Sequence, residues 1–446
     1  MTDFISPNDP SLYGKNDSET IQNAIAAAEA DGCRKIVIPR YNARTGKNEW
    51  RILVSIQVPS HFTILLDNCY MVQETGAYDN MFSSLYAWQP ELSSKPENEQ
   101  MDISIIGQGN VILDGGVHNH LLEKTSKKYR QPRLWRNTMF LWVNVNGLRV
   151  ENLHIENQRW WAMTHVSCRN VKIKNIDFWA IPHVNNMDGI DLRLGCSNFD
   201  IQNITGRTGD DVLAMTALKG DFELPRIVEG RDADIHDVKV RNIKADPNYL
   251  FLVRLLNHDG CNIYNIDLDT LMDTSDYTKK KPSGACVNVG SMLYSHVRPC
   301  EHGETRYVKA KNLTSRGGHA VRMSRTLSHA RFSNIKTFGD NINGVGIDTF
   351  CQLEDVEFEH LWYGAHQQEI FCSKDLKPEN YKGTMLNMVN TTGEVTFRDV
   401  NIDKVKTAVN VSGGVKVTID GLRSNVVNNQ LIKDDKSTVI IDGEVR

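Results

Sequence analysis

Asn170-Val-Lys-Ile-Lys-Asn-Ile176 and Asp237-Val-Lys-Val-Arg-Asn-Ile243 are two copies of the pattern that decides the fold of this chain. Aliphatic and polar residues alternate in each copy, which predicts a short β-strand with one face turned inward. Each copy closes on an asparagine followed by an aliphatic residue. The same pair recurs at Asn152, Asn175, Asn203, Asn242, Asn265, Asn312 and Asn334. The shortest intervals are 22 and 23 residues, and the longer ones are one unit plus an insertion or two units.

This repeat predicts an all-β solenoid, a single-stranded right-handed parallel β-helix. A period of this length, with short strands and almost no helical signal, is typical of stacked β-coils. Each coil buries its apolar face against neighbours ~4.8 Å away. We expect the repeated asparagines to form a side-chain ladder at a turn, which is a structural role. Leucine-rich repeats are disfavoured because Val and Ile dominate and the return segments look extended.

One α-helix is predicted near the start of the chain, and we expect it to cap the first coil. Its apolar face consists of Ile21, Ala24, Ile25 and Ala28, and its N-terminus can be capped by Asn16 or Asp17. Strands are predicted over residues 35–39, 52–59 and 62–66. We therefore expect one domain over residues 1–446, with the cap helix and first strands in 1–70 and the coils in 100–425.

Composition argues against several classes of partner. The net charge is −4 and both signs are mixed along the 446 residues, so no basic stripe suggests nucleic acid. No apolar run approaches the ~18 residues of a membrane helix.

The nine cysteines form no C-x-x-C pair, which favours buried free thiols over a metal or redox motif. The first residues lack a signal-peptide pattern. We expect a cytoplasmic protein without cofactor or metal, and a homo-oligomer is left open.

Two stretches depart from the repeat, Asn186-Met-Asp-Gly-Ile-Asp191 and Gly209-Asp-Asp-Val-Leu-Ala-Met215. Asp188 precedes Asp210 and Asp211 by 22 and 23 residues, which is one coil. Residues one coil apart lie side by side, so we expect three carboxylates in one cluster. Their repulsion should raise the pKa of at least one of them, as a general acid requires, and glycosidic hydrolysis uses such a pair. A calcium site or a solvated acidic turn is the alternative.

Several motifs between about residues 104 and 215 resemble the polygalacturonase family, glycoside hydrolase family 28, within the pectate-lyase-like superfamily. The motifs are Ile105-Ile-Gly-Gln-Gly, Leu113-Asp-Gly-Gly, Trp161-Ala-Met-Thr-His-Val-Ser-Cys, Asn186-Met-Asp188 for the family's N-T-D, and Asp210-Asp211 for its D-D. The resemblance implies an inverting hydrolase in which Asp188 is the acid and Asp210 and Asp211 activate water. Inversion further implies carboxyl groups about 6.5–9.5 Å apart.

The chain also departs from that family, which continues with G-H-G and R-I-K. The corresponding stretches are Pro247–Arg254 and Gly284–Val289, where Cys286 and Asn288 replace the Arg and Lys. In the family those cations bind the substrate carboxylate, so their absence argues against plain polygalacturonate. A similar segment, Gly318-His-Ala-Val-Arg-Met323, is expected about four coils beyond Asp211, roughly 20 Å away. We expect a sugar that is neutral or differently charged.

Five residues are candidates for substrate binding: His183, Asn186, Arg207, Arg254 and Trp161. His183 would lie at the rim, Arg207 would tune the aspartates, and Arg254 would replace the missing cation, although a solvated arginine is an equal alternative. One of Trp160 and Trp161 should be in the core and the other should stack on a sugar. For His165, a core position is favoured over a functional one.

The sequence thus predicts a glycoside hydrolase acting on an oligosaccharide, without nucleic-acid or membrane partners. A β-helix lyase, an epimerase or a fructan-converting transferase acting on carbohydrate is the second class. Lyases of this fold need basic residues beside an acidic substrate, and those residues are missing here. A non-catalytic carbohydrate-binding solenoid is the third class.

Overall fold

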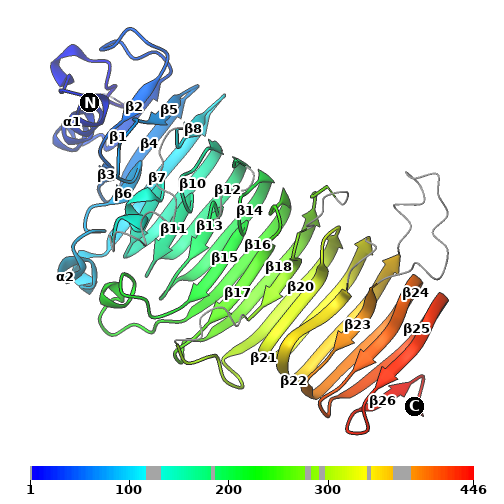
Figure 1. Cartoon of the computed structure of the whole chain (residues 1–446). Helices are drawn as coiled ribbons and strands as arrows, with labels where there is room; N and C mark the ends of the chain where they lie inside the picture. Colours follow the sequence, from blue (N-terminus) through cyan, green and yellow to red (C-terminus); the bar gives the residue numbers. More distant parts are fainter. Residues whose placement is uncertain are drawn as a thin grey trace, which may run out of the picture. The chain divides into compact units, whose positions relative to one another are not determined.

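The computed structural model describes residues 3–116, 132–181, 186–276, 283–290, 297–338, 343–364 and 383–446. The all-β parallel β-helix with an N-terminal α-helix that the sequence predicts is confirmed (Figure 1). Internal contacts divide the chain into two compact units, Met1–Asp211 with Lys219–Asp234, and Val212–Leu218 with Ile235–Arg446. The single domain expected from the sequence stays a prediction. No helix in the described ranges is long and apolar enough to cross a membrane.

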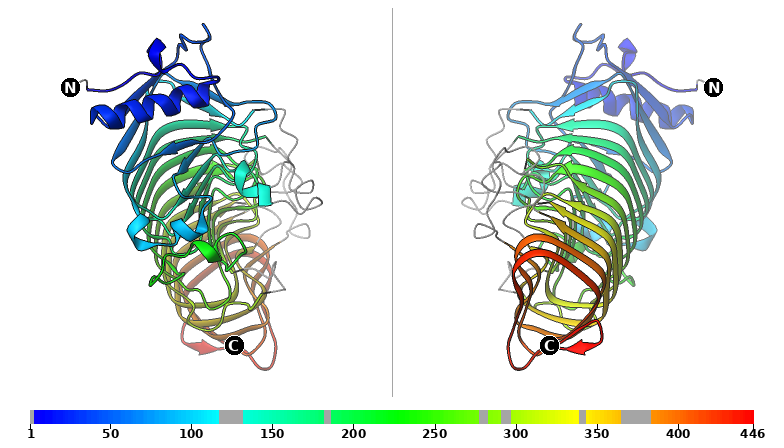
Figure 2. Two further views of the ribbon diagram at one scale, coloured as in Figure 1. Left: turned by 90° about the vertical axis from the view of Figure 1, so that its left-hand side faces the viewer. Right: turned by 90° about the vertical axis from the view of Figure 1, so that its right-hand side faces the viewer.

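Helix α1 (Asp17–Asp31) covers the first coil of the first unit. The Asn16 side chain caps it by accepting a hydrogen bond of 2.9 Å from the N–H of Glu19, and Gly32 ends it at φ 78°. All four residues of the predicted apolar face are at most 1% exposed. The helix contacts β1 (Lys35–Pro39), β2 (Trp50–Ile52) and β3 (Ile56–Val58), so it closes the open end of the first coil (Figure 2). The strand expected over 52–59 is therefore split between β2 and β3.

Parallel ladders build the first unit. One ladder joins β1, β4 (Phe62–Asp67), β7 (Gln100–Gln108), β10 (Val145–Glu156), β12 (Arg169–Trp179) and β14 (Ser197–Arg207). Another joins β3, β6 (Phe82–Ser84), β9 (Phe140–Val143), β11 (Met163–Val166) and β13 (Ile190–Leu192). Shorter strands β5 (Tyr70–Gln73) and β8 (Ile112–Asp114) pair with each other, and β2 and β10 flank them. The short helix η1 (Pro10–Leu12) precedes α1, and four more short helices lie between strands: α2 (Pro90–Ser93), η2 (Pro96–Asn98), η3 (Pro132–Asn137) and η4 (Leu224–Arg226).

The predicted asparagine ladder is confirmed. Asn175 donates to the Asn152 side chain and Asn203 donates to the Asn175 side chain, each at 2.8 Å. All three have φ between 55° and 60°, a left-handed conformation that asparagine tolerates better than most residues. The repeated asparagine therefore turns the backbone once in every coil and links that coil to its neighbour.

Inward-facing aliphatic and aromatic side chains stack in register along the core of the first unit, as Ile173 does on Ile201. The cysteines lie in the same kind of environment. Of the eight in the described ranges, all are free thiols and seven are buried. Burial raises the pKa of Cys196 to about 12. The seven buried thiols are thus core residues, as expected.

The second unit repeats the same construction. One ladder joins β15 (Leu213–Ala217), β17 (Phe251–Asn257), β19 (Ala285–Val289) and β21 (His319–Phe338). Another joins β16 (Ile235–Asp246), β18 (Ile263–Asp273), β20 (Thr305–Ser315) and β21. The coils continue through β22 (Asn343–Gly364), β23 (Thr384–Met388), β24 (Thr391–Val411) and β25 (Lys416–Lys433), and end at β26 (Thr438–Ile441) with the antiparallel β27 (Glu444–Val445).

The second unit corrects one expectation about the segment Gly318–Met323. His319 begins β21, three strand pairings beyond β15 and not four coils. At ~4.8 Å per pairing this is roughly 14 Å. Sequence distance overstated the number of coils because insertions lengthen individual coils, for example between β15 and β16.

Candidate active site

The turns between the two main ladders of the first unit carry the three aspartates. Asp188 lies just before β13, and Asp210 and Asp211 follow β14. In a regular parallel pair, one residue makes both hydrogen bonds that flank its partner on the next strand. Its N–H donates to the residue before that partner, and its carbonyl oxygen accepts from the residue after it. Here the N–H of Gly209 donates to Met187 O at 3.0 Å, while Asp211 O accepts from the N–H of Gly189 at 2.9 Å. Residues 209–211 therefore occupy the place of one residue, and this bulge sets both later aspartates opposite Asp188.

The structure brings the three carboxylates together, as their spacing predicts. One oxygen of each lies within 4.8 Å of those of the other two. Asp188 is 2% exposed, Asp211 is 0% exposed, and Asp210 is half-buried. Their catalytic role stays a prediction.

Backbone N–H groups fix the orientation of the Asp210 carboxylate. Its Oδ1 accepts from the N–H of Asp211 at 3.0 Å, and its Oδ2 accepts from the N–H of Asn186 at 3.1 Å. Asn186 has a φ of 60°, a left-handed conformation accessible to asparagine. Two N–H donors stabilise a negative charge on this carboxylate. Asn186, one of the expected substrate-binding residues, thus contributes its backbone to the aspartate cluster.

The three carboxylates repel one another strongly when they are ionised. Two unit charges 4.8 Å apart repel by about 3 kcal/mol when the effective dielectric constant is about 20. A proton on one carboxylate, or a bound cation, would relieve that repulsion. Carboxylate oxygens suit Ca²⁺ or Mg²⁺, although Ca²⁺ takes roughly six to eight oxygen ligands. The three side chains could therefore serve as an acid–base group or as part of a divalent-cation site.

Trp161 lies one coil before Asp188. Met163 pairs with Ile190, and the N–H of Ala162 donates to Asp188 O at 3.0 Å, which sets Trp161 beside that aspartate. The indole is half-buried, with Trp135 edge-on at 5.2 Å and the Arg193 guanidinium 4.8 Å from its ring centroid. Trp160 is only 8% exposed, so it is the more buried member of the pair.

The Arg207 side chain contacts Ala180 and Trp179. Its Nε and Nη2 donate to Ala180 O at 3.1 and 2.9 Å, and its guanidinium lies 4.5 Å from the ring centroid of Trp179. Tuning of the aspartates by Arg207 stays a prediction. Sequence reasoning missed Trp179, since a single tryptophan within a strand pattern gives no special signal. It also missed Gln158, which is fully buried and supports the turn before Asp188 by donating to Met187 O at 3.3 Å.

The remaining sequence candidates fall into three groups. His183 lies outside the described residues. Arg254 lies on β17 of the second unit, beside Ala214 and Asn288 on the neighbouring strands. It is 8% exposed, so the alternative of a solvated arginine is wrong, while its role as a substrate cation stays a prediction. His165 is a core residue as expected, because it is 0% exposed and burial lowers its pKa to about 4.

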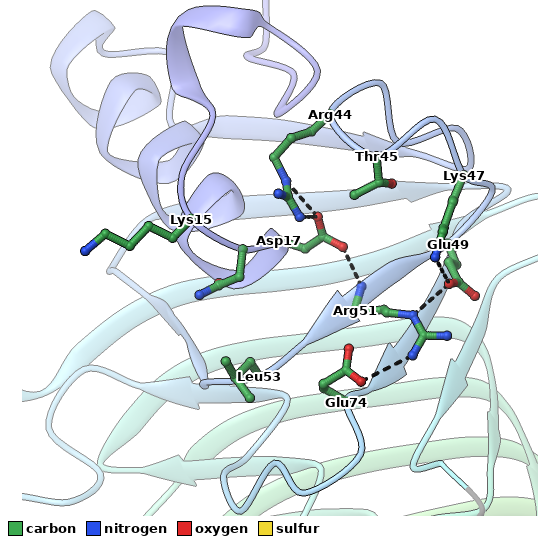
Figure 3. A pocket seen from close by; sticks show the side chains of 10 residues that line it. Lys15, Asp17, Arg44, Thr45, Lys47, Glu49, Arg51, Leu53 and Glu74 are labelled. Carbon is green, nitrogen blue, oxygen red and sulfur yellow. Dashed lines mark hydrogen bonds and ion pairs between the residues drawn. The ribbon is translucent and has the colours of Figure 1, made fainter.

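A pocket of about 150 Å³ lies elsewhere in the first unit, next to the N-terminus of α1 (Figure 3). Ion pairs occupy its charged walls. Arg44 pairs with the buried Asp17 at 2.6 Å, and Arg51 pairs with Glu49 at 2.7 Å and Glu74 at 3.3 Å. The charges thus satisfy one another. The aspartates do not line this pocket, and we assign no chemistry to it.

Comparison with known protein families gives a match over part of the chain. Residues 97–230, which include all three aspartates, match the model described as Glycosyl hydrolases family 28. No curated protein matches the chain in sequence.

Solved structures add a likeness of fold. The tailspike protein of E. coli bacteriophage HK620 shares 11% identity at a TM-score of 0.54, over 98% of this chain and 80% of that chain. The family 28 exopolygalacturonase of Yersinia enterocolitica shares 12% identity at a TM-score of 0.49, over 99% and 78% of the two chains. An exopolygalacturonase of Thermotoga maritima shares 15% identity at a TM-score of 0.45, over 99% and 92%. At such low identity the tailspike likeness supports the fold and nothing further.

Proposed function

Because residues 97–230 match the glycosyl hydrolase family 28 model, we propose that this chain hydrolyses glycosidic bonds of an oligosaccharide with Asp188, Asp210 and Asp211. The observation that carries the proposal is the cluster itself. Three carboxylates, two of them buried, lie within 4.8 Å of one another although their mutual repulsion is unfavourable. General acid–base chemistry is a reason to keep such an arrangement.

The surroundings of each carboxylate support distinct roles. Asp188 is almost fully buried one coil from Trp161, and the resemblance to the family pattern implies the acid role for it. It would donate its proton to the glycosidic oxygen as the bond to the anomeric carbon breaks. Asp210, which accepts two backbone N–H groups, suits the ionised form. With Asp211 it would orient a water molecule and accept its proton as the water oxygen bonds to the anomeric carbon.

The spacing of the carboxylates bears on the stereochemical course. Inverting enzymes typically separate their two carboxyl groups by about 6.5–9.5 Å, and retaining enzymes by about 5–5.5 Å. Here one oxygen of each carboxylate lies within 4.8 Å of one oxygen of the others, which is a distance between single atoms and not the separation of the groups. Inversion is therefore proposed from the family resemblance, and retention through a glycosyl-enzyme is the alternative course. The anomeric form of the first product distinguishes the two.

The substrate is proposed to differ from plain polygalacturonate. Cys286 and Asn288 replace two cations of the family pattern on β19, and they are 0% and 4% exposed. Asn288 donates to Gly290 O at 2.8 Å, so its amide is engaged with the backbone. Neither residue supplies the charge-assisted hydrogen bonds that a uronate carboxylate takes from Arg or Lys. A neutral or differently charged sugar, with one ring against Trp161, fits these residues better.

Activity on a panel of aryl glycosides and oligosaccharides tests the proposal. We expect hydrolysis by the intact protein and a loss of at least about 10²-fold in Asp188→Asn and in Asp211→Asn. Asp200→Asn is the matched control, because Asp200 is a half-buried carboxylate on β14 that accepts from Gln202. Unchanged rates in both site variants would show the carboxylates to be structural. A product absorbing as an unsaturated uronide would instead identify a lyase.

A further inference from the structure

All tryptophans of the chain lie in the described ranges, and Trp179 is the one that is exposed. It ends β12 with 52% of its surface exposed, and Arg207 ends β14 at the paired register position. The Arg207 guanidinium lies over the indole, 4.5 Å from the ring centroid. Both residues belong to the first unit, on neighbouring coils.

The backbone and side chain of Arg207 are both fixed. The N–H of Ala180 donates to Arg207 O at 2.9 Å, and the guanidinium donates back to Ala180 O through Nε and Nη2. The preceding residue, Gly206, has a φ of 97°, and a Cβ there would lie 2.0 Å from Phe178 O. Only glycine fits this close approach. The pair is therefore preorganised before any ligand arrives, which favours binding.

The pair also lies close to the carboxylates along the chain. Arg207 precedes Asp210 by three residues, and at most ~3.5 Å is spanned by each residue, so their Cα atoms are within about 11 Å. This is within the length of a disaccharide. A saccharide whose scissile bond lies at the aspartates can therefore extend one or two sugar rings further to reach Trp179.

We propose that Trp179 and Arg207 form a sugar-binding subsite of the aspartate site, for an oligosaccharide that extends beyond the sugar at the scissile bond. The inference rests on the proposed function. The apolar C–H face of a pyranose ring would pack on the exposed indole, as amphipathic aromatic rings at binding surfaces do. Arg207 would donate from its remaining N–H groups to a hydroxyl or ring oxygen of the same sugar. The subsite therefore selects for chain length.

Length-dependent kinetics of Trp179→Ala test this subsite. For a tetrasaccharide cleaved by the intact protein, we expect kcat/KM to fall roughly tenfold, equivalent to about 1.4 kcal/mol, mainly through KM. The p-nitrophenyl monoglycoside of the same sugar is too short to reach Trp179 and should be hydrolysed at an unchanged rate. Trp179→Phe keeps an aromatic face and should recover part of the loss. Tyr41→Ala is the control, because Tyr41 is equally exposed, at 53%, in the same unit.

The outcomes separate this inference from the proposed function. Equal kcat/KM for Trp179→Ala and the intact protein on both substrates would overturn the subsite, leaving the loss of activity in Asp188→Asn to support the hydrolase. An equal fall on both substrates would also overturn it, since that result indicates a structural role. If the intact protein neither cleaves nor binds any oligosaccharide of the panel, both proposals fall.

Discussion

Replacing Asp188 by asparagine should abolish activity and make the protein more stable. The substitution keeps the shape of the side chain and replaces a carboxyl group, which repels its neighbours whenever it is ionised, by a neutral amide in a cluster whose oxygens lie within 4.8 Å. Each pair of charges at that distance contributes about 3 kcal/mol of repulsion at an effective dielectric constant of about 20. Asp188 takes part in two such pairs.

The observable gain in stability should be smaller than the sum of those pairs. Partial protonation relieves some of the repulsion in the intact protein, and Asp210 is half-buried, so solvent screens its charge. We therefore expect the free energy of unfolding to rise by on the order of 1–3 kcal/mol at neutral pH. Sites that are strained for function commonly become more stable when the functional group is removed.

Urea denaturation followed by tryptophan fluorescence, with initial rates on the best substrate, measures both effects. The denaturation midpoint should shift upward in Asp188→Asn, and the rate should fall by at least about 10²-fold. Asp200→Asn should change neither quantity. A lower midpoint together with retained activity would refute the reasoning, because it would mean that the carboxylate stabilises the fold, for instance as a cation ligand.

Three further predictions concern pH, the asparagine ladder and metal. Burial lowers the pKa of His165 to about 4, whereas the pKa of histidine in the unfolded chain is about 6.5. Between pH 4 and pH 6.5 the imidazole is therefore protonated in the unfolded state and neutral in the folded state. Stability should therefore fall from pH 6.5 to pH 4 by up to about 3 kcal/mol, and a denaturation series should show a shallower slope in His165→Leu; an identical slope would contradict this. Asn175→Ala should lower the free energy of unfolding by about 2 kcal/mol, because alanine loses the bond to Asn152 and disfavours a φ of 55°. Asn175→Gly, which tolerates that φ, should lose less, and equal losses would mean that the conformation contributes nothing. Dialysis against EDTA should leave activity unchanged if the aspartates work as acid and base, whereas loss with recovery on adding Ca²⁺ would assign them to a cation site.

The sequence was sufficient to predict the fold because one pattern carries it. The asparagine that ends each inward-facing strand adopts a left-handed turn and joins a ladder, so Asn152, Asn175 and Asn203 mark both the coil and its period. The cap helix could also be predicted, because its apolar face and its capping Asn16 are local features of the sequence.

Only part of the candidate site could be predicted from the sequence. A separation of one coil predicted that the aspartates meet, but spacing alone leaves open whether Asp188 faces Asp210 or Asp211. The bulge over residues 209–211 sets both opposite it, and that bulge depends on cross-coil hydrogen bonds of Gly209 and Gly189.

Other features depend on tertiary contacts that the sequence does not mark. The pairing of Trp179 with Arg207 requires the register of β12 and β14. The distance to His319 was overstated, because the length of each insertion hides the number of coils. Insertions and side-chain directions across coils therefore set the limit of sequence reasoning here.

The anomeric configuration of the first product, followed by proton NMR during hydrolysis of a substrate of known configuration, tests the central claim most directly. An inverting pair of carboxylates predicts that the product first appears with the opposite configuration and then mutarotates. A product that first appears with the configuration of the substrate would contradict this account and would assign one of the three aspartates as a nucleophile.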